Sequence, residues 1–318
     1  MTARLDFEEP LVELRRKIAE VEKKLAAHPD ERLHLELAEL RRDLEERQRQ
    51  IYRALTPWQK LQVARHPDRP YTLDYVKYIF TDFVELHGDR SFADDPAIVG
   101  GPARLEGRPV MVLGHQKGRD TKEKVRRNFG MAHPEGFRKA QRLMRQAEKF
   151  GLPVISFVDT PAASPTLQDE ERGQAWAIAE SLLTMASLRV PVLVAVIGEG
   201  GSGGALALGV GDRILMLEHA VYSVASPEAA AAIVWKDHSF APRAAEALKI
   251  TAQDLLALGV IDRIVPEPPG GAHCNPALAA EYLKAALLEE LAALSGTPGE
   301  ALVEQRYQKF RRIGYVIE

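Results

Sequence analysis

Residues 196–211 read Val-Ile-Gly-Glu-Gly-Gly-Ser-Gly-Gly-Ala-Leu-Ala-Leu-Gly-Val-Gly, an apolar run that passes through clustered glycines into an Ala/Leu segment. A backbone without Cβ atoms turns sharply and lets a ligand approach its N–H groups closely. N–H groups at the start of a helix have no partner within that helix and stabilise developing negative charge. The pattern predicts an oxyanion hole at the end of a strand, in the cluster of Gly198, Gly200, Gly201, Gly203 and Gly204.

The glycine cluster fits two other glycine-rich motifs less well. A triphosphate-binding loop requires Lys and Ser/Thr after its last glycine, whereas Ala205 and Leu206 follow here. The spacing also differs from the fingerprint of dinucleotide-binding folds. Glycines that serve only a tight turn remain the simpler alternative.

Apolar runs alternate with helical patterns around this segment. Residues 109–114, 153–158 and 191–197 each begin with proline and are rich in branched side chains, which is typical of buried strands. Amphipathic segments at 135–150 and 171–188 lie between them. This alternation predicts an α/β domain with parallel strand pairing and helices on the outside.

The C-terminal half continues the same alternation in shorter segments. Its helices are expected to begin after Ser226 and Thr251, which are good N-caps. The expected elements are strands at 213–217, 220–224 and 261–265 and helices at 227–235, 252–258 and 276–294. The sequence therefore predicts a main domain over 56–296 and a polar C-terminal tail over 297–318.

The first 55 residues follow a different pattern. Leucine, isoleucine and valine recur at steps of three and four from Leu11 to Leu25 and again from Leu33 to Leu44. Pro29 and the N-cap candidate Asp30 separate the two runs. Residues 1–55 are thus predicted to form a helical hairpin, which docks either on a partner subunit or on its own main domain.

Composition limits the class of protein. Among 318 residues, 46% are hydrophobic, the formal net charge is −3, and there is a single cysteine, Cys274. This chain alone therefore forms no disulfide and no zinc ribbon, and nucleic acid is a poor candidate partner. Neither a signal peptide nor a membrane-spanning run is evident, so a soluble cytoplasmic protein is expected.

A second unusual segment, residues 114–131, contains six Lys/Arg between positions 117 and 127. It follows a predicted strand directly, where α/β folds place ligand-binding groups. Lys117 and Arg119 flank Gly118 and suit a phosphate or carboxylate. We predict a substrate-binding role for these three residues, with a solvated basic face as the alternative.

Several long motifs in a fixed order resemble the α subunit of bacterial acetyl-CoA carboxylase carboxyltransferases. The resemblance covers essentially the whole chain, including the predicted hairpin. The motifs are Arg-Pro-Tyr-Thr-Leu-Asp-Tyr (69–75), His-Gly-Asp-Arg (87–90), Gly-His-Gln-Lys-Gly-Arg-Asp-Thr-Lys (114–122), Glu-Glu-Arg-Gly-Gln (170–174), the glycine cluster (196–204), Trp-Lys-Asp (235–237) and Pro-Glu-Pro-Pro-Gly-Gly-Ala-His (266–273).

This resemblance implies a crotonase-like fold of repeated ββα units. It implies transfer of the carboxyl group from carboxybiotin, on a biotin carboxyl carrier protein, to acetyl-CoA, giving malonyl-CoA for fatty acid biosynthesis. The backbone N–H groups of Gly203 and Gly204 would hold the biotin ureido oxygen, and Gly200 and Gly201 would shape the approach. An α2β2 tetramer is implied, with zinc held by the β subunit, no metal in this chain, and biotin carboxylase in the wider complex.

One loop departs from the family pattern. Where the family has glycines and a tyrosine before its Glu-Glu-Arg-Gly-Gln motif, this chain has Ala162, Ser164, Thr166 and Gln168, and Ala229 replaces a further glycine. Added Cβ atoms are costly wherever φ is positive, so altered activity or acyl-CoA specificity is one expectation and harmless drift the other.

Two other function classes stay open at this point. One is a non-catalytic partner of β. The other is a stand-alone hydratase or isomerase of the crotonase type, which requires a general acid or base. Glu170, Glu171 and Glu199 are available for that role, although a solvent-facing or helix-capping role is the simpler expectation for each.

Overall fold

The computed structural model describes residues 5–314, in which seven strands form one sheet. The strand order is β1-β2-β3-β4-β5-β7, and β6 pairs with the end of β4. β1 and β2 form an antiparallel hairpin, and the other strand pairs are parallel. The strands are β1 (Ile98–Leu105), β2 (Arg108–His115), β3 (Val154–Thr160), β4 (Val192–Gly201), β5 (Arg213–Leu217), β6 (Val221–Ser223) and β7 (Arg263–Val265).

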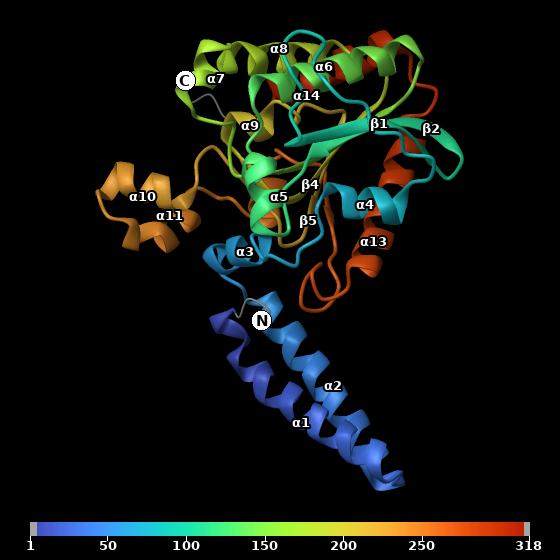
Figure 1. The fold of residues 1–318 in the computed structure, drawn as a ribbon, viewed down its shortest axis with the longest axis vertical. Helices are drawn as coiled ribbons and strands as arrows, with labels where there is room; N and C mark the ends of the chain where they lie inside the picture. The colour runs from blue at the N-terminus through green and yellow to red at the C-terminus, as the bar shows by residue number, and fades with distance from the viewer. Residues whose placement is uncertain (1–4, 315–318) are drawn as a thin grey trace.

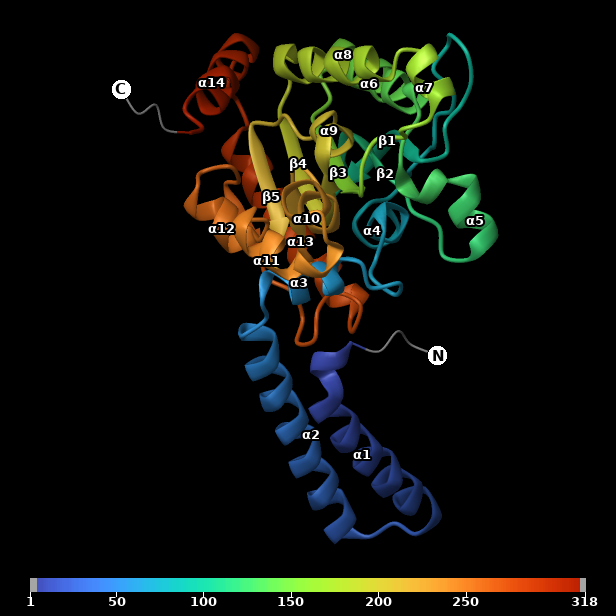
Figure 2. The same cartoon turned by 90° about the vertical axis from the view of Figure 1, so that its left-hand side faces the viewer.

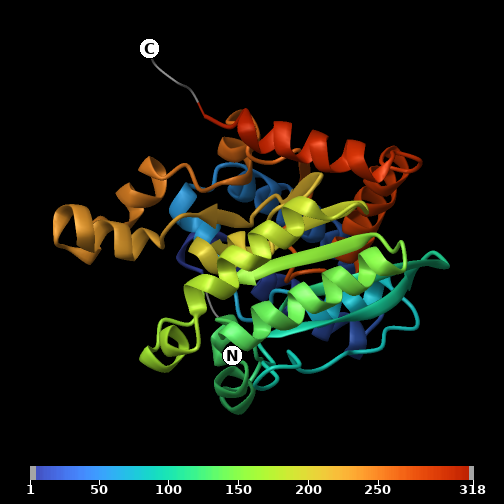
Figure 3. The ribbon, with the colours of Figure 1, turned by 90° about the horizontal axis from the view of Figure 1, so that it is seen from above.

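Helices cover both faces of this sheet (Figure 1). α6 and α8 lie together over one face, and α4 and α13 pack against each other over the opposite face (Figures 1 and 3). The helices are α1 (Glu9–Ala27), α2 (Glu31–Arg53), α3 (Pro57–Ala64), α4 (Thr72–Ile79), α5 (Thr121–Arg126), α6 (Pro134–Lys149), α7 (Leu167–Glu171), α8 (Gln174–Ser187), α9 (Ser202–Leu206), α10 (Pro227–Trp235), α11 (Ala241–Ala247), α12 (Ala252–Ala257), α13 (Pro276–Ala293) and α14 (Gly299–Arg311). Short 3-10 turns lie at Asp6–Glu8, Asn128–Gly130 and His238–Phe240.

The strands expected from apolar runs are present. β3 and β4 are buried along their whole length, as expected for central parallel strands with helices on both faces. The parallel pairing expected for β2, β3 and β4 is confirmed, whereas the unpredicted strand β1 precedes β2 and pairs with it antiparallel. β1 escapes recognition because Gly100, Gly101 and Pro102 interrupt its apolar pattern. A Cβ on Gly101 would lie 1.8 Å from the carbonyl oxygen of Val84, so this strand requires glycine there.

Most predicted helix ends are confirmed. Asp30, Ser226 and Thr251 each accept a hydrogen bond from a backbone N–H in the first turn of the helix that follows. The helix expected over 171–188 is α8, which begins only at Gln174 because Gly173 adopts a left-handed conformation with φ of 83° between α7 and α8.

The N-terminal hairpin is confirmed and projects away from the sheet (Figures 1 and 2). α1 and α2 pack along each other and bury one side of α1, including Leu11, Leu14 and Ile18. At the base, the ring of Tyr52 makes an edge contact with His219 of the main domain, with 5.4 Å between ring centroids. The hairpin therefore meets its own main domain at the base and extends from it along most of its length.

The segment after residue 296 is more ordered than a polar tail. α14 packs against α8, and Arg306 on α14 is buried. The division into 1–55, 56–296 and 297–318 stays a prediction. Among the described residues, no helix combines the length and apolar character needed to cross a membrane.

Candidate active site

The glycine-rich segment lies where the sheet changes partners. β4 pairs with β5 through residues 193–196, then continues and pairs with β6 through residues 199–201. On its other side Gly200 pairs with Thr160, after an irregularity at the end of β3. The loops after β3, β4 and β6 therefore meet at one edge, and α9 begins directly after Gly201.

The glycines are required by close contacts between backbones. A Cβ on Gly201 would lie 1.8 Å from the carbonyl oxygen of Pro161, and one on Gly204 would lie 2.4 Å from the nitrogen of Ala163. A Cβ on Gly200 would meet the ring of Tyr222 at 2.8 Å. Gly203 is different, because it is only half-buried and its nearest neighbour would be Ile178 at 3.6 Å. Of these four glycines, Gly203 has the most open surroundings.

Ser202 lies between the strand and the open glycine. Its φ of 54° is in the left-handed region, which a residue with a side chain adopts at a cost. This conformation turns the chain from β4 into α9, and Ser202 itself is exposed.

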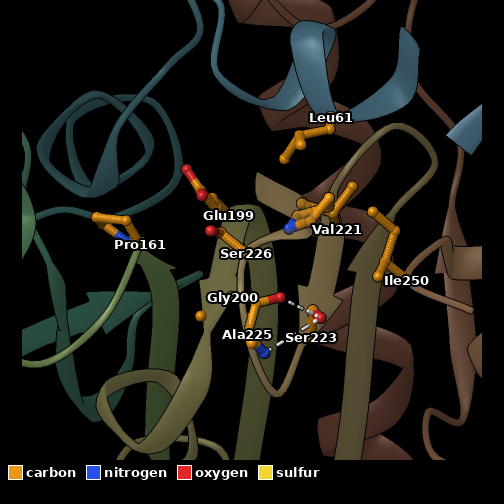
Figure 4. A pocket seen from close by; sticks show the side chains of 11 residues that line it. Leu61, Pro161, Glu199, Gly200, Val221, Ser223, Ala225, Ser226 and Ile250 are labelled. Carbon is orange, nitrogen blue, oxygen red and sulfur yellow. Dashed lines mark hydrogen bonds between the residues drawn. The ribbon is translucent and has the colours of Figure 1, made fainter. Parts of the chain in front are cut away.

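A narrow pocket opens beside this turn (Figure 4). Pro161 and Glu199 lie on one side of it, and Leu61, Val221 and Ile250 lie on the other (Figure 4). The remaining lining residues are Gly200, Gly201, Ser223, Ala225, Ser226 and Pro227. The pocket thus brings together the glycine loop, α3 and the segment that enters α10.

Lys117 lies beside the glycine loop and is already paired. Its Nζ atom is 2.8 Å from Asp159 Oδ1 and 3.8 Å from Glu199 Oε2. Burial alone would lower the pKa of Lys117, but Asp159 and Glu199 raise it above its ordinary value, so the ammonium group stays charged. Asp159 Oδ1 also accepts a hydrogen bond from the backbone N–H of Glu199. These three side chains link the loop after β2 to the ends of β3 and β4.

Arg119 lies farther out and holds the segment before α4. It donates hydrogen bonds to the carbonyl oxygens of Pro67 and Arg69, pairs with Asp74, and stacks 3.9 Å from the centre of the Tyr71 ring. Gly118 is required between the two cations, since a Cβ there would lie 2.2 Å from the backbone nitrogen of Lys124. This part of the basic segment therefore forms specific contacts and is not simply a solvated face.

Arg65, at the C-terminal end of α3, was missed by the sequence analysis. Its Nε and Nη2 atoms lie 3.1 and 2.8 Å from Glu199 Oε1, and its Nη1 atom lies 2.5 Å from Glu228 Oε1. No motif signals this contact, because the three residues are far apart in the chain. The solvent-facing role expected for Glu199 is wrong, as this carboxylate is buried between Arg65 and Lys117, whereas Glu170 and Glu171 are exposed as expected.

The loop that departs from the family pattern has its own supporting contacts. Ser164 is buried and donates to Asp169, and Thr166 caps α7 by accepting from the backbone N–H of Asp169. None of Ala162, Ser164, Thr166, Gln168 and Ala229 has a positive φ. Their Cβ atoms therefore impose no left-handed strain.

No three His, Cys, Asp or Glu side chains within residues 5–314 are grouped so that they could share a metal ion. The glycine-rich turn lies beside paired charges and a narrow pocket.

Comparison with known sequences covers nearly the whole chain. Residues 4–314 match the family described as acetyl co-enzyme A carboxylase carboxyltransferase-like. The chain is 58% identical over 316 residues to the acetyl-coenzyme A carboxylase carboxyl transferase subunit alpha of Geobacillus kaustophilus, covering 99% of this chain and 97% of that protein. The subunit of the same name from Thermus thermophilus is 56% identical over 314 residues, with 99% of both chains covered.

Solved structures with low sequence identity share the fold. A chain of a Pseudomonas malonate decarboxylase hetero-tetramer in complex with coenzyme A matches with a TM-score of 0.60 at 19% identity, over 76% of this chain and 97% of that one. The transcarboxylase 12S core, with methylmalonyl-coenzyme A and methylmalonic acid bound, matches with a TM-score of 0.54 at 20% identity, over 69% of this chain and 42% of that one. The predicted crotonase-like α/β fold is confirmed by this likeness. The sequence matches show that the chain belongs to the family of acetyl-CoA carboxylase carboxyltransferase α subunits.

Proposed function

We propose that this chain transfers a carboxyl group from carboxybiotin to acetyl-CoA to form malonyl-CoA, acting together with a β subunit. The observation that carries this proposal is 56–58% identity, over nearly the full length of both chains, to acetyl-coenzyme A carboxylase carboxyl transferase α subunits. Carboxybiotin enters the site as a substrate carried on a carrier protein. In a cell the product would supply fatty acid biosynthesis.

The glycine loop is the proposed catalytic group of this chain. The backbone N–H groups of Gly203 and Gly204 would stabilise negative charge on the ureido oxygen of biotin, while Gly200 and Gly201 set the path of the strand. The half-buried position of Gly203 and its open surroundings support this assignment. Loss of one oxyanion-hole donor costs about 3 kcal/mol of transition-state stabilisation.

Lys117, Gly118 and Arg119 are the proposed substrate-binding residues. Lys117 is charged and lies beside the glycine loop, where its field favours an anionic substrate group. Arg119 lies on the surface nearby, with Gly118 allowing the tight turn between them. Because both cations are already paired, they would act on the substrate at a distance or by sharing their present partners.

The proposed partners follow from the family. A β subunit would complete an α2β2 tetramer and hold the zinc, and the biotin carboxyl carrier protein and biotin carboxylase would act with this tetramer in the cytoplasm. The malonate decarboxylase of similar fold is itself described as a hetero-tetramer, which supports assembly from unlike chains. A stand-alone hydratase is disfavoured because Arg65 and Lys117 already hold the carboxylate of Glu199, the candidate base.

The test is carboxyl transfer between malonyl-CoA and free biotin, measured with this chain alone, with a β subunit alone and with both, together with the mass of each sample in solution. We expect activity only in the mixture, at the mass of an α2β2 tetramer. A tetramer without activity would show a non-catalytic or differently specific subunit. Activity of this chain alone, without biotin, would show a hydratase or isomerase.

A further inference from the structure

We propose that Arg65 is a positioning residue that holds the glycine loop in register with α10. This inference rests on the carboxyl transfer proposed above and adds a residue to it. The guanidinium group contacts two carboxylates that belong to different segments, Glu199 just before the glycine turn and Glu228 in the first turn of α10. These two segments form parts of the wall of the pocket in Figure 4.

The end of the contact at the glycine loop is firmly fixed. Two nitrogens of Arg65 converge on one oxygen of Glu199, and the other oxygen faces Lys117. The Glu199 side chain is only 8% exposed. A buried carboxylate that loses one of its cationic partners moves or takes up a proton, because an uncompensated buried charge is costly. Removal of Arg65 would therefore displace Glu199 and, through the backbone, the glycines that follow it.

The other end of the contact lies on α10, which packs on α11, and Trp58 of α3 packs against this pair of helices. α10 and α11 stand out from the body of the molecule (Figures 1 and 3). α11 packs on α3. Arg65, which follows the last residue of α3, contacts Glu228 in the first turn of α10. Glu228 keeps its charge there, since burial would raise its pKa but Arg65 and Ser226 lower it below the ordinary value.

Arginine suits this position better than lysine. A guanidinium group is planar and presents several N–H donors in fixed directions, so it can hold two carboxylates at once, whereas lysine is a single point charge. Arg65 would act through Glu199 and has no contact with the proposed oxyanion hole itself. Its effect should therefore appear in the rate of the chemical step more than in substrate affinity.

The experiment compares Arg65→Ala, Arg65→Lys and Glu228→Gln with the natural chain, each mixed with the β subunit. For Arg65→Ala we expect kcat to fall by about tenfold or more with little change in KM for malonyl-CoA, because a shift of about 1 Å at a reacting centre costs up to about 100-fold. Arg65→Lys should recover part of this loss, and Glu228→Gln should lose less than Arg65→Ala. Arg145→Ala, which removes a largely exposed pair with Glu180, is the matched control and should keep full activity.

A second measurement does not depend on activity. Hydrogen exchange of the natural chain and of Arg65→Lys and Arg65→Ala should show faster exchange at residues 196–206 in the variants. Unchanged exchange together with unchanged kcat would overturn the proposal, and a rise in KM at constant kcat would show that Arg65 binds substrate instead. If the natural mixture forms a tetramer without activity, the proposed function fails, while the exchange result still decides the role of Arg65.

Discussion

Gly201 approaches another backbone more closely than any residue with a side chain allows. Its missing Cβ would lie 1.8 Å from the carbonyl oxygen of Pro161. We expect Gly201→Ala to force the loops after β3 and β4 apart and to lower stability by about 1–3 kcal/mol. Gly203→Ala is the matched variant for stability, because its Cβ would meet only Ile178 at ordinary contact distance. Thermal unfolding measures both, and equal melting temperatures would contradict the proposed packing.

His115, at the end of β2, is fully buried. Burial lowers its pKa from 6.5 to about 3. The folded chain therefore keeps this ring neutral while the unfolded chain binds a proton below pH 6.5, so stability falls as pH decreases through this window. Between pH 6.5 and 5 this ring alone should lower the free energy of unfolding by about 1.5 kcal/mol. The slope is about 1.4 kcal/mol per pH unit once the unfolded ring is protonated.

Denaturant unfolding of the natural chain and of His115→Leu at both pH values checks this expectation. The variant should show a smaller decrease between the two pH values, and this window lies above the ordinary range of carboxylate titration. The same decrease in both chains would mean that other groups cause the pH dependence.

At the scale of elements, α14 is anchored by one buried arginine. Arg306 makes two hydrogen bonds to Asp212, at 3.0 and 2.8 Å, and further bonds to the carbonyl oxygens of Met185, Leu188 and Val190. Arg306→Ala should cost about 3–5 kcal/mol, because it leaves Asp212 buried without its partner. The control Arg189→Ala removes an exposed ion pair between Arg189 and Glu300 on α14. It should change the free energy of unfolding by about 1 kcal/mol or less. Similar losses in the two variants would show that α14 is not held by Arg306.

The loop between β3 and α8 tests whether its lost glycines impair function. Because none of the residues at positions 162, 166 and 168 has a positive φ, restoring glycine there relieves no strain. We expect the triple variant to lose about 1–3 kcal/mol of stability, from the cap lost at Thr166 and from a more flexible unfolded chain, with no gain in rate. Thr166→Ser keeps the cap and serves as the control. A faster triple variant in the mixture with β would show that the natural loop limits activity.

Prediction of elements from the sequence succeeded where burial produces a long apolar pattern. β2, β3, β4 and α13 lie close to their expected positions. β1 and α14 were missed for opposite reasons. Glycine and proline interrupt the apolar pattern of β1. The polar sequence of α14 gives no sign that Arg306 is buried, because its partner Asp212 lies 94 residues earlier in the chain. Local patterns report burial of apolar side chains and do not report long-range ion pairs.

At the scale of the whole molecule, the glycine loop was predictable and its surroundings were not. Glycine clustering between a strand and a helix is visible in a short window of sequence. The contacts of Lys117, Arg65 and Glu199 depend on how three strand ends and α3 meet, which no spacing in the chain reveals. From the sequence, Lys117 was predicted to bind substrate, with a solvated basic face as the alternative, and Arg65 was not singled out.

The N-terminal hairpin projects from the main domain and is therefore a candidate surface for binding a partner subunit. It extends from the sheet in Figures 1 and 2, and its apolar seam is closed between α1 and α2. Arg41 and Glu22 pair across the two helices at 2.7 Å, so a short Gly-Ser turn that replaces residues 23–40 should close the hairpin there and keep its base.

We expect this shortened chain to keep the melting temperature of the natural one, because the base contacts of Tyr52 and Leu55 remain. If the distal hairpin binds the partner subunit, the mixture with β should shift from the mass of a tetramer toward that of separate subunits. The matched control is Arg16→Ala, which removes only exposed ion pairs on α1. A shortened chain that still forms the full tetramer would assign assembly to the main domain and leave the hairpin free to meet the carrier protein.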